Sequence, residues 1–256
     1  MRKEESQFGA SNILEGMTSV SALLAAHKAG VNDRPIHEIR FDRAKKQKKA
    51  REYAFLTGKC AELNIPLTLT DAAELEKICI GNTHGGIIAL CGERTLPLPA
   101  AENLPESGFL CLLEGIEDPY NFGYALRSLY AAGCDGILLG ERNWLSAAGV
   151  VARASAGASE SMPVWAGDTE AAISMLKDKG YKIVCAGIRD SVSLYEADLK
   201  KPLLLVVGGE KRGISAEMLS KANQIVRIDY GRAFRGSLSA ASAATVLAFE
   251  ILRQNK

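Results

Sequence analysis

The feature that most constrains this chain is a series of short apolar runs in its second half, separated by stretches of helical periodicity. Residues 202–207 contain five consecutive aliphatic side chains, and 109–114 and 182–186 are of the same kind. Strands buried on both faces have this pattern, and they form parallel sheets covered by helices. Further strands are predicted at 136–139 and 224–228, and helices at 123–132, 146–154, 169–179, 215–222 and 239–254. We therefore predict an α/β fold with a parallel sheet and helices on both sides.

The first part of the chain predicts a smaller α/β layer domain. Strands are expected at 36–41, 66–69 and 86–91, and helices at 11–29, at 43–63 and from Thr70 or Asp71 to about Cys79. A break with three prolines follows near residues 93–108. The expected organisation is a domain at 1–95, a linker at 96–107 and a second domain at 108–256.

Composition excludes several classes of protein. Lys and Arg number 31 against 30 Asp and Glu, so any nucleic-acid binding must come from local basic patches. No apolar run approaches the ~20 residues that span a bilayer, and the first residues lack the apolar core of a signal peptide, which predicts a cytoplasmic protein. Six cysteines without CxxC spacing and three scattered histidines predict buried free thiols and no metal site.

Three segments follow predicted strands, where open parallel sheets bind ligands. In the first, residues 114–133, Asn121 is expected to cap a helix, and Arg127 lies within its first two turns. A cation there is unfavourable by ~0.3–1 kcal/mol unless an anion offsets it, so a phosphate or carboxylate partner is attractive. The alternative is a capped helix with a solvated arginine.

The second and third segments are glycine-rich and serine-rich. Three glycines surround Glu210 within residues 203–215, which permits close backbone approach or positive φ, but neither a P-loop nor GxGxxG is present. Ser237 and Ser239 open an alanine-rich helix within residues 226–254. The plain alternatives are an ordinary strand-to-helix turn and an N-capped core helix.

Taken together, these segments resemble the three motifs of the SpoU/TrmH family of RNA 2′-O-ribose methyltransferases, in the SPOUT superfamily. Residues 121–127 are similar to N-x-G-x-x-x-R, residues 208–213 to G-x-E-x-x-G, and residues 237–239 with the following helix to S-L-N-x-S-x-A, in the same order. Residues 151–163 also look like the family's segment between motifs. The resemblance implies a trefoil-knotted second domain, S-adenosylmethionine as cofactor, a ribose 2′-hydroxyl as acceptor and a homodimer without metal.

The resemblance also assigns residues. It implies a catalytic group, Asn121, Arg127, Glu210, Ser237 and Ser239, and cofactor contacts at Gly208, Gly209, Ile228 and Leu238. The stretches EGMTSVSALL and GNTHGGIIALC, with the helix at 43–63, look like an L30e-like RNA-binding domain, which favours ribosomal RNA, most readily 23S rRNA.

Two basic clusters are the expected RNA contacts. Residues 40–51 hold seven Lys or Arg in twelve positions, and a second cluster lies beside the third motif. The assigned residues are Arg40, Arg43, Lys45, Lys46, Lys48, Lys49, Arg232 and Arg235. The alternative is a solvated helix face. Aromatic residues make up only 6%, which does not predict base stacking as a main mode of recognition.

The chain departs from the family pattern at two places. Ser239 stands where the third motif carries Asn, and the loop before it, residues 229–236, is one residue longer and more basic than usual. The Ser239 departure motivates one alternative, a catalytically inactive RNA-binding protein of the same fold. A tRNA 2′-O-methyltransferase is a further alternative, which the N-terminal domain disfavours.

Overall fold

The computed structural model describes residues 12–79, 84–140 and 143–256, which form two compact units. The first unit comprises the described residues up to Thr95 together with Trp144–Ser161. The second comprises Leu96–Asn143, apart from residues 141 and 142, and Met162–Lys256. Residues 144–161, which the sequence places in the second domain, thus belong to the first unit. Gly81, Asn82 and Thr83 of the GNTHGG stretch lie outside the described residues.

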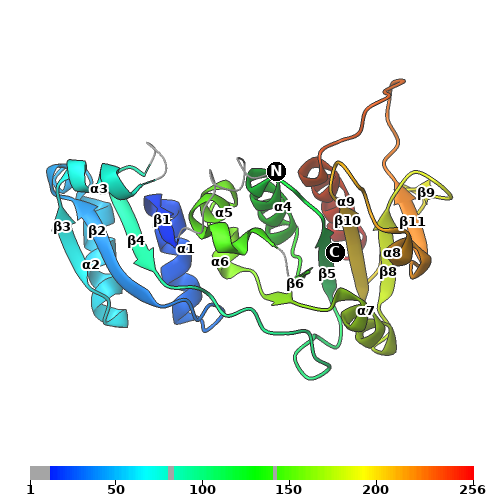
Figure 1. Ribbon diagram of the computed structural model, residues 1–256, viewed down its shortest axis with the longest axis horizontal. Helices are drawn as coiled ribbons and strands as arrows, with labels where there is room; N and C mark the ends of the chain where they lie inside the picture. Colours follow the sequence, from blue (N-terminus) through cyan, green and yellow to red (C-terminus); the bar gives the residue numbers. More distant parts are fainter. Residues whose placement is uncertain (1–11, 80–83, 141–142) are drawn as a thin grey trace. The chain divides into compact units, whose positions relative to one another are not determined.

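The second unit is built on a seven-stranded sheet in which every neighbouring pair is parallel (Figure 1). The strand order is β7-β6-β5-β10-β8-β11-β9. The strands are β5 Phe109–Glu114, β6 Gly136–Leu139, β7 Val164–Ala166, β8 Lys182–Ala186, β9 Val192–Ser193, β10 Leu203–Gly208 and β11 Gln224–Arg227. β5 and β10 are almost fully buried, as their uninterrupted apolar sequences predict.

Helices cover both faces of this sheet (Figure 1). They are α4 Pro119–Ala131, α7 Thr169–Asp178, α8 Ala216–Ser220 and α9 Ala240–Gln254. Ile173 of α7 and Met218 of α8 pack in one cluster with Leu110 and Leu204, which point to the same face of neighbouring strands. α4 packs against α9, and α9 lies on β10, at the opposite face. The prediction of a helix-covered parallel sheet is confirmed.

The proline-rich segment before β5 lies on the second unit. The backbone N–H of Ala166 donates to the carbonyl of Pro97 at 3.1 Å, and the Tyr181 hydroxyl donates to that of Pro105 at 3.1 Å. Leu104 is buried in the same cluster as Leu110. The segment is therefore fixed to the core that it precedes.

The first unit has a four-stranded mixed sheet in the order β1-β4-β2-β3. Its strands are β1 Ile13–Glu15, β2 Ile36–Asp42, β3 Leu67–Thr70 and β4 Ile87–Cys91. Its helices are α1 Gly16–Lys28, η1 Arg43–Lys45, α2 Ala50–Leu63, α3 Ala72–Ile78, η2 Trp144–Ala147, α5 Ala148–Ala154 and α6 Ala158–Ser161. The helix predicted at 11–29 begins with a strand instead, because the apolar residues before Gly16 pair with β4.

Residues 144–161 join the first unit through apolar packing and a buried charge pair. Ala148 and Ala152 lie in its hydrophobic core. The Glu160 carboxylate, 1% exposed, accepts hydrogen bonds from Arg34 Nε at 3.0 Å and Asn32 Nδ2 at 2.6 Å. Gly157, at φ +85°, sits so close to α1 that a Cβ would lie 2.4 Å from that of Ala22. Only glycine fits this contact.

All six cysteines are free thiols, and five are buried, as predicted. Burial raises the pKa of Cys91, Cys134 and Cys185 to about 12. Among the described residues no group of His, Cys, Asp and Glu side chains could hold a metal ion. Across the same residues, every helix falls short of the length and apolar character needed to cross a bilayer.

Candidate active site

The carboxyl ends of β5 and β10 lie side by side, and their following loops touch. Glu114 is the register partner of Gly208, and Gly209 N–H donates to the Glu114 carbonyl at 2.7 Å. A Cβ on Gly209 would lie 1.9 Å from the carbonyl oxygen of Gly115, and one on Gly208 would lie 2.3 Å from the carbonyl carbon of Gly213. Of the two roles that the sequence allowed these glycines, Gly208 and Gly209 serve close backbone approach, because a second backbone occupies the space of each missing side chain.

Glu210 joins three separate chain segments at this edge of the sheet. Its Oε1 accepts a hydrogen bond from Asn121 Nδ2 at 3.0 Å and another from the backbone N–H of Ala240 at 3.0 Å. Asn121 belongs to α4, and Ala240 is the first residue of α9. A carboxylate at a helix N-terminus is stabilised by the helix dipole, so the exposed Glu210 is held at this point.

The expectation that Asn121 caps α4 is wrong. Asp118 is the cap: its carboxylate accepts hydrogen bonds from Tyr120 N at 3.3 Å and Asn121 N at 3.1 Å, and Pro119 takes the first helical position. Proline there leaves no N–H unsatisfied. Asn121 lies inside the first turn, so its amide is free to bind Glu210. The Asp-Pro pair was the signal for this cap.

Arg127 lies further along α4, and its side chain is exposed. It forms no ion pair with any residue that the structure describes. Next to it, Thr245 Oγ1 donates to Ser128 Oγ at 2.6 Å, which ties α9 to α4. Arg127 is therefore a solvent-facing cation on a helix whose position is fixed by its neighbours.

Ser239 is the N-cap of α9. Its hydroxyl accepts from Ser242 N at 3.2 Å and donates to Ser242 Oγ at 3.0 Å. Ser and Asn are about equally good N-caps, so the serine found in place of the family's asparagine preserves the start of this helix. Ser237 is exposed two residues earlier, beside the same helix start.

The predicted cofactor contacts lie at the ends of β10 and β11 and before α9. Leu238 N–H donates to the Tyr230 hydroxyl at 3.2 Å, which joins the loop after β11 to the start of α9. Ile228 and Leu238 are half-buried, and Gly209 is buried. The close-packed glycine backbone brings the main chain of Gly208 and Gly209 to this edge, together with the Glu210 carboxylate and the hydroxyls of Ser237 and Ser239. These groups fit a cationic nucleoside cofactor, because main-chain groups and hydroxyls can hydrogen-bond an adenosine and a carboxylate is compatible with a positive charge.

The basic run of the first unit is partly neutralised by its own neighbours. Three of its cations form ion pairs: Arg40 with Glu38, Arg43 with Asp71 and Lys45 with Asp42. Lys46 lies 4.5 Å above the ring of Tyr53. Lys48 and Lys49 have no ion-pair partner among the described residues, and neither have Arg232 and Arg235 in the second unit. These four are the assigned RNA contacts with a free charge.

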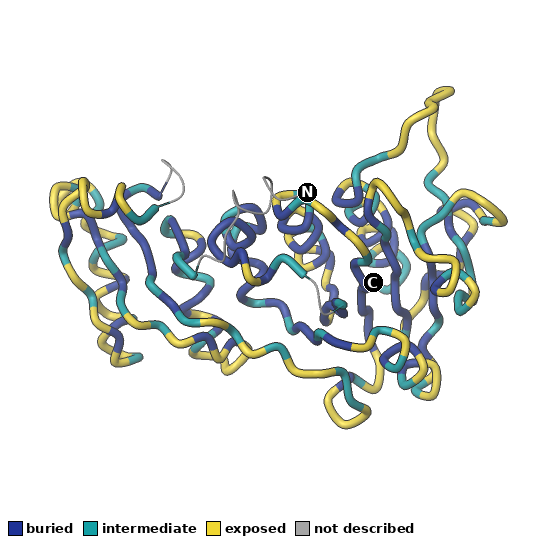
Figure 2. The backbone as a smooth tube through the Cα atoms, viewed as in Figure 1, coloured by how far each residue is buried: buried dark blue, intermediate teal, exposed yellow. Residues whose placement is uncertain are grey.

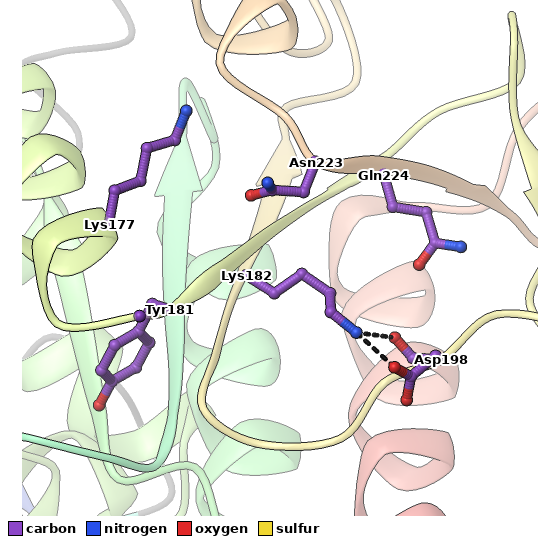
Figure 3. Close-up of a pocket in the computed structure, with 7 residues that line it drawn as sticks. Lys177, Tyr181, Lys182, Asp198, Asn223 and Gln224 are labelled. Carbon is purple, nitrogen blue, oxygen red and sulfur yellow. Dashed lines mark hydrogen bonds and ion pairs between the residues drawn. The ribbon is translucent and has the colours of Figure 1, made fainter.

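A hollow lies at the opposite edge of the sheet (Figure 3). It encloses about 620 Å³ and contains none of the residues assigned from the sequence. Its lining comes from the amino ends of β8 and β11, and its two facing charges are paired, with Lys182 Nζ 2.6 Å from Asp198 Oδ2. The motifs therefore lie away from this hollow.

The helix-covered parallel sheet, with glycine loops packed at its carboxyl edge, is the fold of SPOUT methyltransferases. One solved RNA 2′-O ribose methyltransferase superposes with a TM-score of 0.73 at 25% identity, over 99% of this chain and 92% of that one. An AdoMet-bound rRNA methyltransferase from Sinorhizobium meliloti gives 0.76 at 23% identity, over 99% and 90%. The expected fold class, with a small domain before the sheet, is confirmed; the knot and the L30e-like label stay predictions.

The chain belongs to the SpoU rRNA Methylase family, whose sequence model matches residues 108–249. A relative from Shewanella oneidensis, a 23S rRNA (guanosine-2′-O-)-methyltransferase, is 31% identical over 199 residues, or 74% of this chain and 79% of that protein. The family predicted from the three motifs is thereby confirmed.

Proposed function

We propose that the protein is an S-adenosylmethionine-dependent RNA methyltransferase that methylates a ribose 2′-hydroxyl in 23S rRNA. The observation that carries the proposal is the Glu210 carboxylate, which joins Asn121 of the first motif to Ala240 behind the third. Three motifs that are far apart in sequence meet at one edge of the sheet. The named 23S rRNA relative supports the same reading.

The cofactor supplies a methyl group on a positively charged sulfur, so the transfer needs no metal to activate the donor. We assign the backbone at Gly208, Ile228 and Leu238 to the adenosine, and the buried Gly209 to the close approach of that backbone. Holding donor and acceptor in line contributes up to ~7–11 kcal/mol to the lowering of the barrier. The protein's main task is therefore alignment.

Arg127 is assigned to the RNA. A guanidinium stays protonated at any working pH, so it is unsuited to take the hydroxyl proton itself. Its planar group instead fits the phosphate next to the target ribose, with two parallel hydrogen bonds. That phosphate can accept the proton of the hydroxyl. The hydrogen bond from Asn121 to Glu210 fixes the start of α4, the helix that carries Arg127.

A homodimer is part of the proposal. α4 and α9 pack together and leave exposed apolar side chains: Tyr124 is 48% exposed, Val246 37% and Phe249 46%. A second copy of the same surface would bury them through a two-fold contact. We also propose a cytoplasmic location, where ribosomal RNA is found.

The alternatives are less well supported. The hypothesis of a catalytically inactive protein depends on Ser239 standing in place of asparagine, but this serine caps α9 as an asparagine would. The tRNA reading is disfavoured by the 23S rRNA activity in the name of the relative and by the additional first unit.

The proposal is tested with purified protein, tritiated S-adenosylmethionine and a 23S rRNA transcript. Incorporation of tritium, followed by mapping of 2′-O-methyl sites with and without the enzyme, is the expected result. Binding of the cofactor measured by calorimetry, without any methyl transfer to 23S rRNA or its fragments, would contradict it.

A further inference from the structure

The loop between β11 and α9, residues 229–238, stands away from the rest of its unit (Figure 1). Nearly all of it is exposed, and Figure 2 shows it as the projecting strip between the two elements. It contains residues 229–236, the loop that the family resemblance predicts to be longer and more basic than usual. It leads directly into Ser239 and the helix start that Glu210 holds.

The loop has internal structure. The rings of Tyr230 and Phe234 meet edge to face with centroids 5.7 Å apart, and the Tyr230 hydroxyl accepts from Leu238 N–H at 3.2 Å. A Cβ on Gly236 would lie 2.6 Å from Cζ of Phe234, so glycine makes room for that ring. Phe234 is nevertheless 58% exposed. One side of the ring is held and the rest faces water.

The charges of the loop are unbalanced at its tip. Asp229 accepts hydrogen bonds from the Ser193 hydroxyl and from Arg227 Nε, the second at 2.8 Å, and these partners lower its pKa. The carboxylate is thereby occupied at the base of the loop. Arg232 and Arg235 are exposed and pair with no acid among the described residues. The tip presents two free guanidiniums beside an exposed ring.

We propose that this loop binds an unpaired stretch of the substrate RNA, with a base stacked on Phe234 and phosphates bound by Arg232 and Arg235. An exposed ring between free cations is the combination that holds single strands. A duplex would offer phosphates but no base face. Because the loop continues into the site, the stacked base is a near neighbour of the methylated nucleotide. The low aromatic content of the chain does not conflict with this, since one well-placed ring suffices.

The test compares Phe234→Leu with Phe234→Trp. Leucine keeps apolar volume but cannot stack, so affinity for a single-stranded oligouridylate, read by fluorescence anisotropy, falls about tenfold. Tryptophan retains it within about twofold. Phe55→Leu, at a phenylalanine of α2 that is 44% exposed, is the matched control and changes little. Affinity for an RNA duplex of the same length is unaffected by all three variants.

The arginines are tested by salt dependence. The double variant Arg232→Gln with Arg235→Gln gives a plot of log affinity against log salt that is shallower by about 1.4, at ~0.7 per phosphate contact on a single strand. An unchanged slope would overturn their role. Equal effects of Phe234→Leu and Phe55→Leu on oligouridylate affinity would overturn the stacking role. A Phe234→Leu protein that changes its oligomeric state but binds RNA as before would overturn it too.

This inference rests on the proposed function, and the two can fail separately. Absence of methyl transfer by the unaltered protein, with oligouridylate still bound through Phe234, counts against the function alone. Methyl transfer by Phe234→Leu with an unchanged KM for RNA counts only against the proposal that the loop binds RNA through Phe234.

Discussion

Asn121 Nδ2 lies 3.0 Å from Glu210 Oε1, a hydrogen bond between residues 89 positions apart in sequence. The same oxygen accepts from the first N–H of α9. A single carboxylate thus fixes the starts of two helices that carry different motifs. Its consequences for stability and for activity can be separated experimentally.

Replacing Glu210 by Gln keeps an acceptor oxygen, whereas Ala removes it. We expect Glu210→Ala to lose about 1 kcal/mol of unfolding free energy and Glu210→Gln to lose less, because two N–H groups keep a partner only in the second. Urea-induced unfolding measures the difference. Methyl transfer should fall in both variants and further in Glu210→Ala; equal stability of the two would contradict the bridging role.

Arg127→Ala should abolish most methyl transfer while leaving the fold intact. The side chain is exposed and without an ion pair among the described residues, so its removal changes stability within about 0.5 kcal/mol. We expect a loss of about a hundredfold or more in kcat/KM, and only partial recovery in Arg127→Lys, since lysine cannot form two parallel phosphate contacts. Full activity of Arg127→Ala would remove this residue from the mechanism.

Ser239→Asn should be neutral for stability, because both residues cap helices well, whereas Ser239→Ala should cost about 1 kcal/mol. Thermal unfolding of the three proteins gives the comparison. Methyl transfer by Ser239→Asn should match or exceed that of the unaltered protein. A clear loss of stability in Ser239→Asn would show that the serine does more than cap α9.

Glu160→Gln should destabilise the first unit by about 3 kcal/mol, because Arg34 would remain buried without a compensating charge. Replacing both partners, as Arg34→Met with Glu160→Leu, should recover much of that loss. The unfolding free energies of the unaltered protein, Arg34→Met, Glu160→Leu and the variant with both substitutions form the double-mutant cycle. Additive losses in the double variant would mean that the two side chains do not interact.

Stability should fall at alkaline pH as the thiols titrate. The folded pKa of Cys91 and Cys185 is about 12 and that of Cys79 about 11, against 9.0 for a free thiol. A raised folded pKa stabilises the protein below pH 9, and this contribution is lost as pH rises from about 9 to 12. Urea unfolding across that range tests the sign. At pH 8, Ellman's reagent should react slowly until the protein unfolds.

Much of the fold could be predicted because most of its longer strands are continuous runs of apolar residues. The parallel strands around β10 are uninterrupted apolar segments, and short runs of that kind are typical of strands buried on both faces of a sheet. The short strands β1, β7 and β9 were not predicted, because two or three residues carry no periodicity. The predicted cap of α4 is three residues from the true one, since Asp118 and Asn121 are equally good caps and only the folded structure distinguishes them.

The sequence predicted which residues belong to the site, but it did not predict which of them contact one another. The glycines around Glu210 were expected to allow close approach or positive φ, yet the partner backbone at Gly115 could not be named from one sequence. No sequence signal predicts the hydrogen bond from Thr245 to Ser128 or the one from Ser193 to Asp229, because only the fold brings these residues together.

Because residues 144–161 belong to the first unit, neither unit is one continuous segment that could be separated by a single cut. The chain passes between the two units at three places, after Thr95, after Asn143 and after Ser161. Cleavage in the proline-rich segment would therefore leave two fragments still interlocked through α5 and α6. A shortened protein beginning at residue 108 would lose the partners of Ala148, Ala152 and Glu160, and we expect it to aggregate although it retains the whole region that matches the family.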